Sequence, residues 1–170
     1  EGHFYYDVER AGLDTIHAFD KPIYTGVALQ VSKEKDGKYV FSANNKAILY
    51  DSKSGKVEYI FDQVRSHGAV LINNDQMLVS TYTHHELFLV DIQQDKIVKN
   101  LALDILKKYP QINTYYRRIK HLDDEYVGIT SGHQGLFIMN TRDFSVQNYA
   151  HDISNPSSIS SDNSYLLYPQ

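Results

Sequence analysis

The sequence predicts an all-β fold of β-propeller blades, each built from four antiparallel strands, with about four blades in 170 residues. The first observation is a unit that recurs four times. In each unit an apolar, aromatic-rich strand ends in Asp or Asn, and a polar turn and another strand follow. These strands end at Asp7, Asp51, Asp91 and Asn140, which are 40 to 49 residues apart. Self-similarity at this period is typical of propeller blades. The second observation is the 14 tyrosines, which suit half-buried strands.

The first complete blade is expected over residues 26–62. Its clearest hairpin signal is Asp36-Gly37, a dipeptide that favours the backbone angles of a tight turn. The strands are expected at Ala28–Val31, Tyr39–Ser42, Ala47–Tyr50 and Val57–Phe61, with further turns at Asn44-Asn45 and Ser54-Gly55.

Two more blades are expected over residues 63–102 and 103–152. Their strands are expected at Ala69–Ile72, Met77–Tyr82, Leu87–Val90 and Ile97–Leu101, and at Tyr116–His121, Tyr126–Thr130, Leu136–Met139 and Ser145–Tyr149. Between the two blades, Leu103–Tyr109 predicts a helical turn that stops before Pro110, because the residue before a proline is disfavoured in a helix. This insertion accounts for the longest spacing between units.

The two ends of the chain supply only parts of blades. Residues 1–25 supply the last two strands of one blade, and residues 153–170 supply the first strand of another, at Asn163–Tyr168. Closed propellers have 4 to 8 blades, and an arc with open edges exposes unpaired strand backbone. We therefore expect the chain to be part of a larger propeller, completed by the remaining blades of a parent protein or by a second copy in a homodimer.

Composition narrows the classes of partner. The net charge of −4 and the pI near 6.0 do not favour a nucleic-acid partner, which requires a concentrated basic face. The absence of cysteine rules out disulfides and thiolate metal sites. No apolar run is long enough to span a membrane, so no direct membrane contact is expected from this segment. No signal peptide is visible, and the start at Glu1 indicates a processed or excised chain.

The stretch from Glu125 to Tyr168 resembles the two-component regulator propeller repeat. The matching residues, in order, are Gly128 and Thr130, Gly135-Leu136, Tyr149 with His151-Asp152, Asn155-Pro156, and Ser158-Ile159-Ser160. The chain departs from the family where Tyr39, Met77 and Tyr126 stand in place of a frequent second-strand tryptophan. The usual Asp-Gly after the first strand is kept only at Asp36-Gly37.

This resemblance implies a location and a role. Such repeats form the periplasmic sensor region of hybrid histidine kinases, which sit in an inner membrane and often respond to products of glycan breakdown. The chain would then be a piece of such an ectodomain, with kinase, receiver and DNA-binding parts outside it. An oligosaccharide would be its ligand.

The candidate ligand-binding residues share one end of the predicted propeller. There the loops between second and third strands meet the connections between blades. Aromatic, imidazole and guanidinium groups on one rim suit a sugar or a sugar acid, because arginine pairs with carboxylate or sulfate. These residues are Arg65, His67, His84, His85, Tyr115, Tyr116, Arg117, Arg118, His133 and Gln134. They also have an ordinary interpretation as solvated loop residues, since loops are polar by default.

Other polar groups have simpler structural interpretations. Adjacent histidines on one strand end point in different directions, so His84-His85 predicts no metal site. His67, before Gly68, also fits a packing role between blades. His151-Asp152 is expected to cap a connection between blades. The strand-ending Asp51, Asp91 and Asn140 are expected to bond nearby backbone N–H groups.

Three functions remain open. The leading one is a ligand-sensing module without catalysis and without a cofactor, because no nucleophile, phosphate-loop or metalloprotease motif occurs. The second is a propeller scaffold for protein–protein interaction, which would expose a large apolar patch. The third is a glycan lyase or hydrolase, which needs two convergent ionisable groups. The nearest carboxylates, Asp123, Asp124 and Glu125, are expected on the opposite face, which argues against this enzyme.

Overall fold

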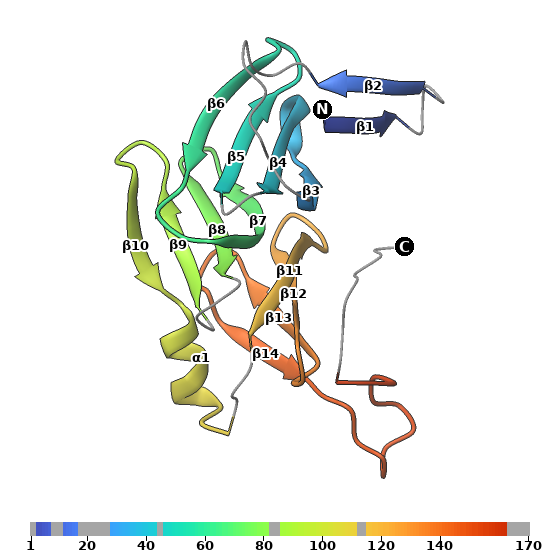
Figure 1. Cartoon of the computed structure of the whole chain (residues 1–170). Coiled ribbons are helices and arrows are strands. Elements are labelled where there is room, and N and C mark those ends of the chain that lie inside the picture. Colours follow the sequence, from blue (N-terminus) through green and yellow to red (C-terminus); the bar gives the residue numbers. More distant parts are fainter. Residues whose placement is uncertain are drawn as a thin grey trace.

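The computed structural model describes residues 3–7, 12–16, 28–43, 46–81, 86–111 and 115–162. These residues form three four-stranded antiparallel sheets and one two-stranded hairpin (Figure 1). The predicted all-β fold of propeller blades is confirmed. The strand expected at 163–168 lies outside the described residues.

Each sheet keeps its strands in sequence order, as propeller blades do. The bounds of the hairpin strands are β1 (His3–Asp7) and β2 (Gly12–Ile16). The sheets contain β3 (Ala28–Lys33), β4 (Lys38–Ala43), β5 (Lys46–Asp51) and β6 (Lys56–Phe61); β7 (Ser66–Asn73), β8 (Gln76–Thr81), β9 (Leu87–Asp91) and β10 (Lys96–Asn100); and β11 (Tyr116–His121), β12 (Tyr126–Ser131), β13 (Leu136–Asn140) and β14 (Val146–Tyr149). Below, these are called the first, second and third sheets.

The recurring Asp or Asn at the strand ends forms the turn that follows it. The Oδ1 atoms of Asp51, Asp91 and Asn140 accept hydrogen bonds of 2.8 Å from backbone N–H groups two or three residues on. For Asp51 this bond, from Lys53, is the main reason that the carboxyl pKa lies below its ordinary value. The turn-forming role predicted for these residues is confirmed.

The tight turn predicted at Asp36-Gly37 is also present. Lys35–Gly37 forms a short 3-10 turn, η1, in which both Asp36 and Gly37 have positive φ angles, 60° and 81°. The turn closes with a 2.8 Å hydrogen bond from the N–H of Glu34 to the carbonyl of Lys38. It places Glu34 at the end of the first sheet.

Apolar side chains fill the spaces between neighbouring sheets. One core cluster joins the second and third sheets and includes Val70, Leu78, Ile119 and Phe137. A second cluster joins the first and second sheets through residues such as Val40 and Met77, and both of these are fully buried. Burial on both faces explains why the inner strands are almost continuously apolar.

The predicted helical turn is present as α1 (Ala102–Lys108), between β10 and β11. Ala102 and Ile105 are buried in the cluster between the second and third sheets. The amide oxygen of Asn100 accepts a 3.1 Å hydrogen bond from the N–H of Ala102, which satisfies one of the free donors at the start of the helix. The segment therefore covers the outer end of the core between these sheets.

The first strands of the three sheets converge at the inner edge of the arc. The side chain of Gln30, on β3, donates 3.2 Å to the carbonyl of Ala69 on β7. It also bonds both backbone groups of Ile119 on β11, at 2.5 Å to the carbonyl and 3.0 Å from the N–H. One amide thus connects three sheets, including two that are not consecutive in the chain.

Buried hydroxyls on the second strands join neighbouring sheets as well. Ser66, at the start of β7, donates 3.1 Å to the hydroxyl of Ser42 on β4. Ser80, on β8, donates 2.8 Å to the carbonyl of Arg117 on β11. These bonds fix the position of β7 along β4 and of β11 along β8. They therefore also fix where the side chains of β11 lie relative to the second sheet.

Candidate functional site

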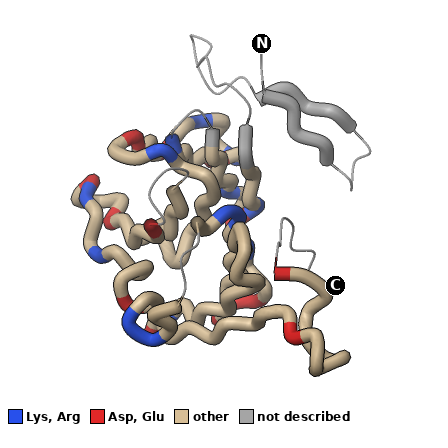
Figure 2. Tube along the Cα trace, turned by 60° about the horizontal axis from the view of Figure 1, so that its bottom comes forward, with Lys and Arg blue, Asp and Glu red and all other residues tan. Residues whose placement is uncertain are grey.

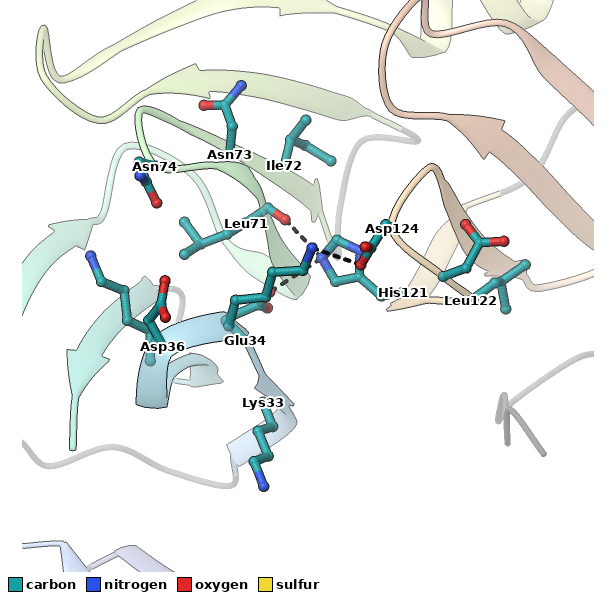
Figure 3. A pocket seen from close by; sticks show the side chains of 13 residues that line it. Lys33, Glu34, Asp36, Leu71, Ile72, Asn73, Asn74, His121, Leu122 and Asp124 are labelled. Atoms are coloured by element: carbon teal, nitrogen blue, oxygen red, sulfur yellow. Dashed lines mark hydrogen bonds and ion pairs between the residues drawn. The ribbon is translucent and has the colours of Figure 1, made fainter. Parts of the chain in front are cut away.

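The two ends of the arc carry different chemistry. At one end the β12–β13 loop meets the residue that precedes β11; this is the rim predicted from the sequence. At the other end the turns after β3, β7 and β11 surround a cavity (Figure 3). None of the ligand-binding residues predicted from the sequence lies at that second end.

The structure brings together most of the predicted rim residues that it describes. Arg65 is exposed in the connection between β6 and β7, and His133 is exposed in the β12–β13 loop. Gln134, in the same loop, is fixed by its backbone: its N–H bonds the hydroxyl of Ser131 and its carbonyl accepts from Asn148. His84 and His85 lie outside the described residues.

Tyr116 is not at the rim. Its side chain is 1% exposed and packs edge-to-face on Phe137, with ring centroids 5.7 Å apart. Burial raises the pKa of its phenol to about 12. Tyr115, the residue before β11, is only half-buried, so the two adjacent tyrosines have different surroundings. We therefore exclude Tyr116 from the candidate site.

An aromatic and guanidinium cluster forms the centre of the rim. Nη2 of Arg117 donates a 2.5 Å hydrogen bond to the hydroxyl of Tyr115, and its guanidinium carbon lies 4.9 Å from the centre of that ring. The Tyr115 ring meets the imidazole of His133 edge-on, at 6.0 Å. The backbone of Gly132 also bonds the carbonyl of Tyr115. These contacts hold the Tyr115 ring in one orientation between the arginine and the histidine.

Arg118 contributes a second, less satisfied guanidinium. Its Nη1 atom is buried and has no hydrogen-bond partner among the described residues. None of the ion pairs within the described ranges involves Arg118. Burial and the neighbouring charge of Arg117 both lower the pKa of Arg118. The side chain as a whole is only half-buried, so the rest of the guanidinium can donate to an acceptor of negative charge.

The imidazole of His67 lies near Arg117 and Arg118 and is neutral. It is 8% exposed on β7. Burial, followed by the charges of Arg118 and Arg117, lowers its pKa below 6.5. The rim therefore contains two guanidinium charges next to an uncharged imidazole, which can act as a hydrogen-bond donor or acceptor toward a ligand.

The cavity at the opposite end has a volume of about 420 Å³. Its residues come from the turns after β3, β7 and β11. They are Lys33, Glu34, Lys35, Asp36, Lys38, Leu71, Ile72, Asn73, Asn74, His121, Leu122, Asp123 and Asp124. A volume of this size is within the range of small-molecule sites.

An ion pair between the buried carboxylate of Glu34 and the half-buried imidazole of His121 forms one wall of this cavity. In Figure 3, Glu34 and His121 point toward one another, and His121 Nε2 lies 3.2 Å from Glu34 Oε2. The same nitrogen is 2.8 Å from the carbonyl of Leu71. The side chain of Glu34 is only 4% exposed, and its Oε1 atom is buried without a hydrogen-bond partner among the described residues. The pair joins the first and third sheets directly.

A second, exposed ion pair crosses the mouth of the cavity. Lys35 Nζ lies 2.7 Å from Asp124 Oδ1, and both side chains are 78% exposed. The lysine is the main cause of the lowered pKa of Asp124. Exposed pairs of this kind contribute little stability. The Lys35–Asp124 pair nevertheless joins the same two turns as the Glu34–His121 pair.

The Glu34–His121 pair predicts a pH dependence of stability. The hydrogen bond to Glu34 is the main cause of a His121 pKa above 6.5. The stabilisation of the folded protein by this ion pair is therefore complete at pH values below 6.5. It is lost as pH rises through the pKa that His121 has in the folded protein. We expect the difference in unfolding free energy between the natural protein and His121→Gln to shrink between about pH 5 and about pH 8.

Urea unfolding at a series of pH values measures this difference. His67 acts in the opposite sense, because its lowered pKa removes stability as pH falls. It is present in both proteins, so its contribution cancels in the comparison. A difference that grows with pH, or does not change, would contradict the proposed charge on His121.

The sequence contained one usable signal for this pair. Lys33 and His121 are the last residues of β3 and β11, the first strands of their sheets, and Glu34 directly follows Lys33. Equivalent strand ends lie at the same end of a propeller, so the two side chains could have been placed on one face. Their contact could not be predicted, because 87 residues separate them and no local motif joins them.

Charge is otherwise dispersed, and no basic concentration stands out along the described trace (Figure 2). Within the described ranges no cluster of three or more His, Asp or Glu residues could hold a metal ion. No helix in the described part of the chain is long and apolar enough to cross a membrane.

Comparison with known proteins places the fold. No family model matches the chain, and no curated protein matches it. Among solved structures, the WD40 β-propeller domain of Doa1 is similar with a TM-score of 0.60 and 14% identity, over 86% of this chain and 53% of that one. The extracellular domain of BT4673, a putative one-component system of B. thetaiotaomicron, is similar with a TM-score of 0.60 and 14% identity, over 95% of this chain and 21% of that one.

These similarities define the fold class as a β-propeller. The chain spans about half of the Doa1 chain and about a fifth of the BT4673 chain. Kuenenia stuttgartiensis hydrazine synthase is also similar, with a TM-score of 0.53 and 11% identity over 78% of this chain and 38% of that one. At such low identity the likeness concerns the fold, and function has to be argued from the site.

Proposed function

We propose that the chain is a ligand-sensing, extracytoplasmic propeller segment of a hybrid two-component sensor, and that its ligand is an acidic oligosaccharide. The observation that carries this proposal is the half-buried guanidinium of Arg118, which lies beside the charge of Arg117 and forms no ion pair within the described ranges. The neighbouring Arg117 and the oriented ring of Tyr115 supply a second charge and an aromatic face. A uronate carboxylate or a sulfate would satisfy the guanidinium, and a sugar ring would pack on the tyrosine.

The periplasmic location and the role in signalling rest on the repeat-like residues between Glu125 and Tyr168. The domain of BT4673 that has a similar fold is extracellular, which is compatible with that location. In this proposal the chain binds and does not catalyse. Its partners are the remaining blades of the parent protein or a second copy of the chain, joined through sheet edges.

Binding of tetragalacturonate, measured by calorimetry against neutral maltotetraose, tests the proposal. We expect the acidic tetrasaccharide to bind and the neutral one to bind more weakly. Arg118→Ala should weaken the acidic ligand roughly tenfold or more, because a hydrogen bond to a charged group is lost. A sulfated oligosaccharide of similar length shows whether the site prefers sulfate to carboxylate.

Arg142→Ala is the matched control. Arg142 is an exposed arginine in the turn between β13 and β14, where it pairs with Glu125. It changes the net charge by the same amount without touching the rim, so binding should be nearly unchanged. Equal losses in the two variants would mean non-specific attraction. Failure of both acidic ligands to bind would contradict the proposed ligand class.

A further inference from the structure

The contact between Glu34 and His121 joins two turns that belong to the first and third sheets. We propose that this contact is a pH-dependent conformational switch: protonated His121 holds the two turns together beside the cavity, and neutral His121 lets them separate. The opening is local to this end of the arc and differs from the global unfolding considered above. The switch requires no ligand, and it is independent of the function proposed for the rim.

The surroundings of the His121 imidazole favour its charged form. Nε2 lies 3.2 Å from Glu34 Oε2 and 2.8 Å from the carbonyl oxygen of Leu71. The backbone of Asp123 also accepts a hydrogen bond from the ring. These three neighbours are all acceptors, and an imidazolium has two N–H donors whereas a neutral imidazole has one. Loss of the proton therefore weakens this set of bonds and removes the positive charge beside Glu34.

The carboxylate of Glu34 depends on that positive charge. Its side chain is 4% exposed, and Oε1 is buried without a hydrogen-bond partner among the described residues. Removing the charged partner of a buried ion leaves an uncompensated charge, which is strongly destabilising. Movement of Glu34 into water relieves this cost, so the turn that carries Glu34 moves away from His121 when the imidazole becomes neutral.

The other charged groups around the cavity do not replace the switch. Lys35 and Asp124 join the same two turns, but both side chains are 78% exposed and the pair is screened by water. The ionisable residues of the lining are Lys33, Glu34, Lys35, Asp36, Lys38, His121, Asp123 and Asp124, and the lining residues of β7 and the turn after it carry no charge. Of these residue types, only histidine ordinarily changes its charge between about pH 5 and about pH 8.

The hydrogen bonds of Gln30 confine the movement to the turns. The Gln30 amide holds β3 against β11 at Ile119. Gln30 lies four residues before Glu34, and Ile119 lies two residues before His121. The segments after these two points can separate while the strands themselves stay together. The cavity of about 420 Å³ then becomes more open to solvent.

Paramagnetic broadening of NMR signals measures the separation of the turns. The sequence contains no cysteine, so Lys53→Cys accepts a single nitroxide label. Lys53 is exposed, and its side chain lies against Gly37 in the turn after β3. The label should broaden the methyl signals of Leu122 at about pH 5, and we expect this broadening to fall about twofold or more at about pH 8, where the open form is the major state. The midpoint should coincide with the titration of the His121 imidazole.

Glu34→Gln and His121→Gln test the two members of the pair. Each substitution removes one of the two charges, so the broadening of Leu122 should no longer change with pH. His151→Gln is the matched control, because His151 is an exposed histidine in the connection after β14 and does not line the cavity. The pH response of this variant should equal that of the natural protein.

Three results would overturn the proposal. Constant broadening across the pH range would mean that Glu34 is neutralised in place and that the turns stay together. A pH response that persists in Glu34→Gln or His121→Gln, or that disappears in His151→Gln, would assign the titration to another group. Simultaneous shifts of the buried methyl groups of Val70 and Leu78 would mean global unfolding. No oligosaccharide is present in this experiment, so its failure leaves the rim proposal standing, and the reverse also holds.

Discussion

Replacing Phe137 with alanine is expected to lower the free energy of unfolding by about 3 to 5 kcal/mol, the range found when a large buried aromatic side chain is removed. Phe137 lies on β13, is fully buried, and belongs to the cluster that joins the second and third sheets. It also packs edge-to-face on Tyr116. Its loss leaves a cavity that the two strand-paired neighbours of β13 hold open, because β12 and β14 bond it on both sides.

Urea unfolding followed by circular dichroism and by tyrosine fluorescence measures this loss. Ile153→Ala is the control, because Ile153 is a large apolar residue that is 95% exposed. It should change the free energy of unfolding by about 0.5 kcal/mol or less. A similar small loss in Phe137→Ala would mean that the second and third sheets do not share one core.

Replacing Gly68 with alanine is expected to cost about 2 to 3 kcal/mol, through a contact that the backbone cannot easily relieve. A Cβ atom at this position would lie 2.6 Å from the carbonyl oxygen of Arg117 and 2.7 Å from Oε1 of Gln30. Relief requires β7 and β11 to move apart, and that movement also breaks the hydrogen bonds of Gln30. Hydrogen exchange at Ile119 should therefore become faster in this variant.

Gly55→Ala separates this contact from backbone strain. Gly55 has a φ of 69°, and nothing lies within 4 Å of an added Cβ. Its replacement should cost roughly 1 kcal/mol, the penalty of a left-handed conformation, without changing exchange at Ile119. If Gly68→Ala is less costly than Gly55→Ala, the close approach of the second and third sheets at this point is wrong.

The repeat was predictable because its signals are local. The Asp or Asn that ends a strand bonds a backbone N–H two or three residues on, so the same side chain recurs wherever the same turn is needed. The helix at Ala102–Lys108 was visible for a similar reason, since Pro110 limits its end. Interactions between residues only a few positions apart leave a pattern in the sequence, and such patterns can be recognised in a single sequence.

The candidate sites were only partly predictable because they depend on how the sheets meet. The rim prediction grouped Tyr115 with Tyr116, although Tyr116 is buried in the core against Phe137. The contact between Glu34 and His121 depends on the angle between the first and third sheets. Gln30 helps to set that angle through its hydrogen bonds to Ala69 and Ile119. No sequence motif predicts these bonds.

The bonds of Gln30 have a consequence for the order in which the chain folds. In a linear array of repeats each unit contacts only its neighbours, so the units can fold and unfold one by one. Here Gln30 pairs with Ile119 across 89 residues, past the whole second sheet. Closing so long a loop costs conformational entropy, and this cost comes before the Gln30–Ile119 contact can stabilise the fold. The three sheets are thus expected to unfold in a single cooperative step, with the inner edge as the last part to assemble.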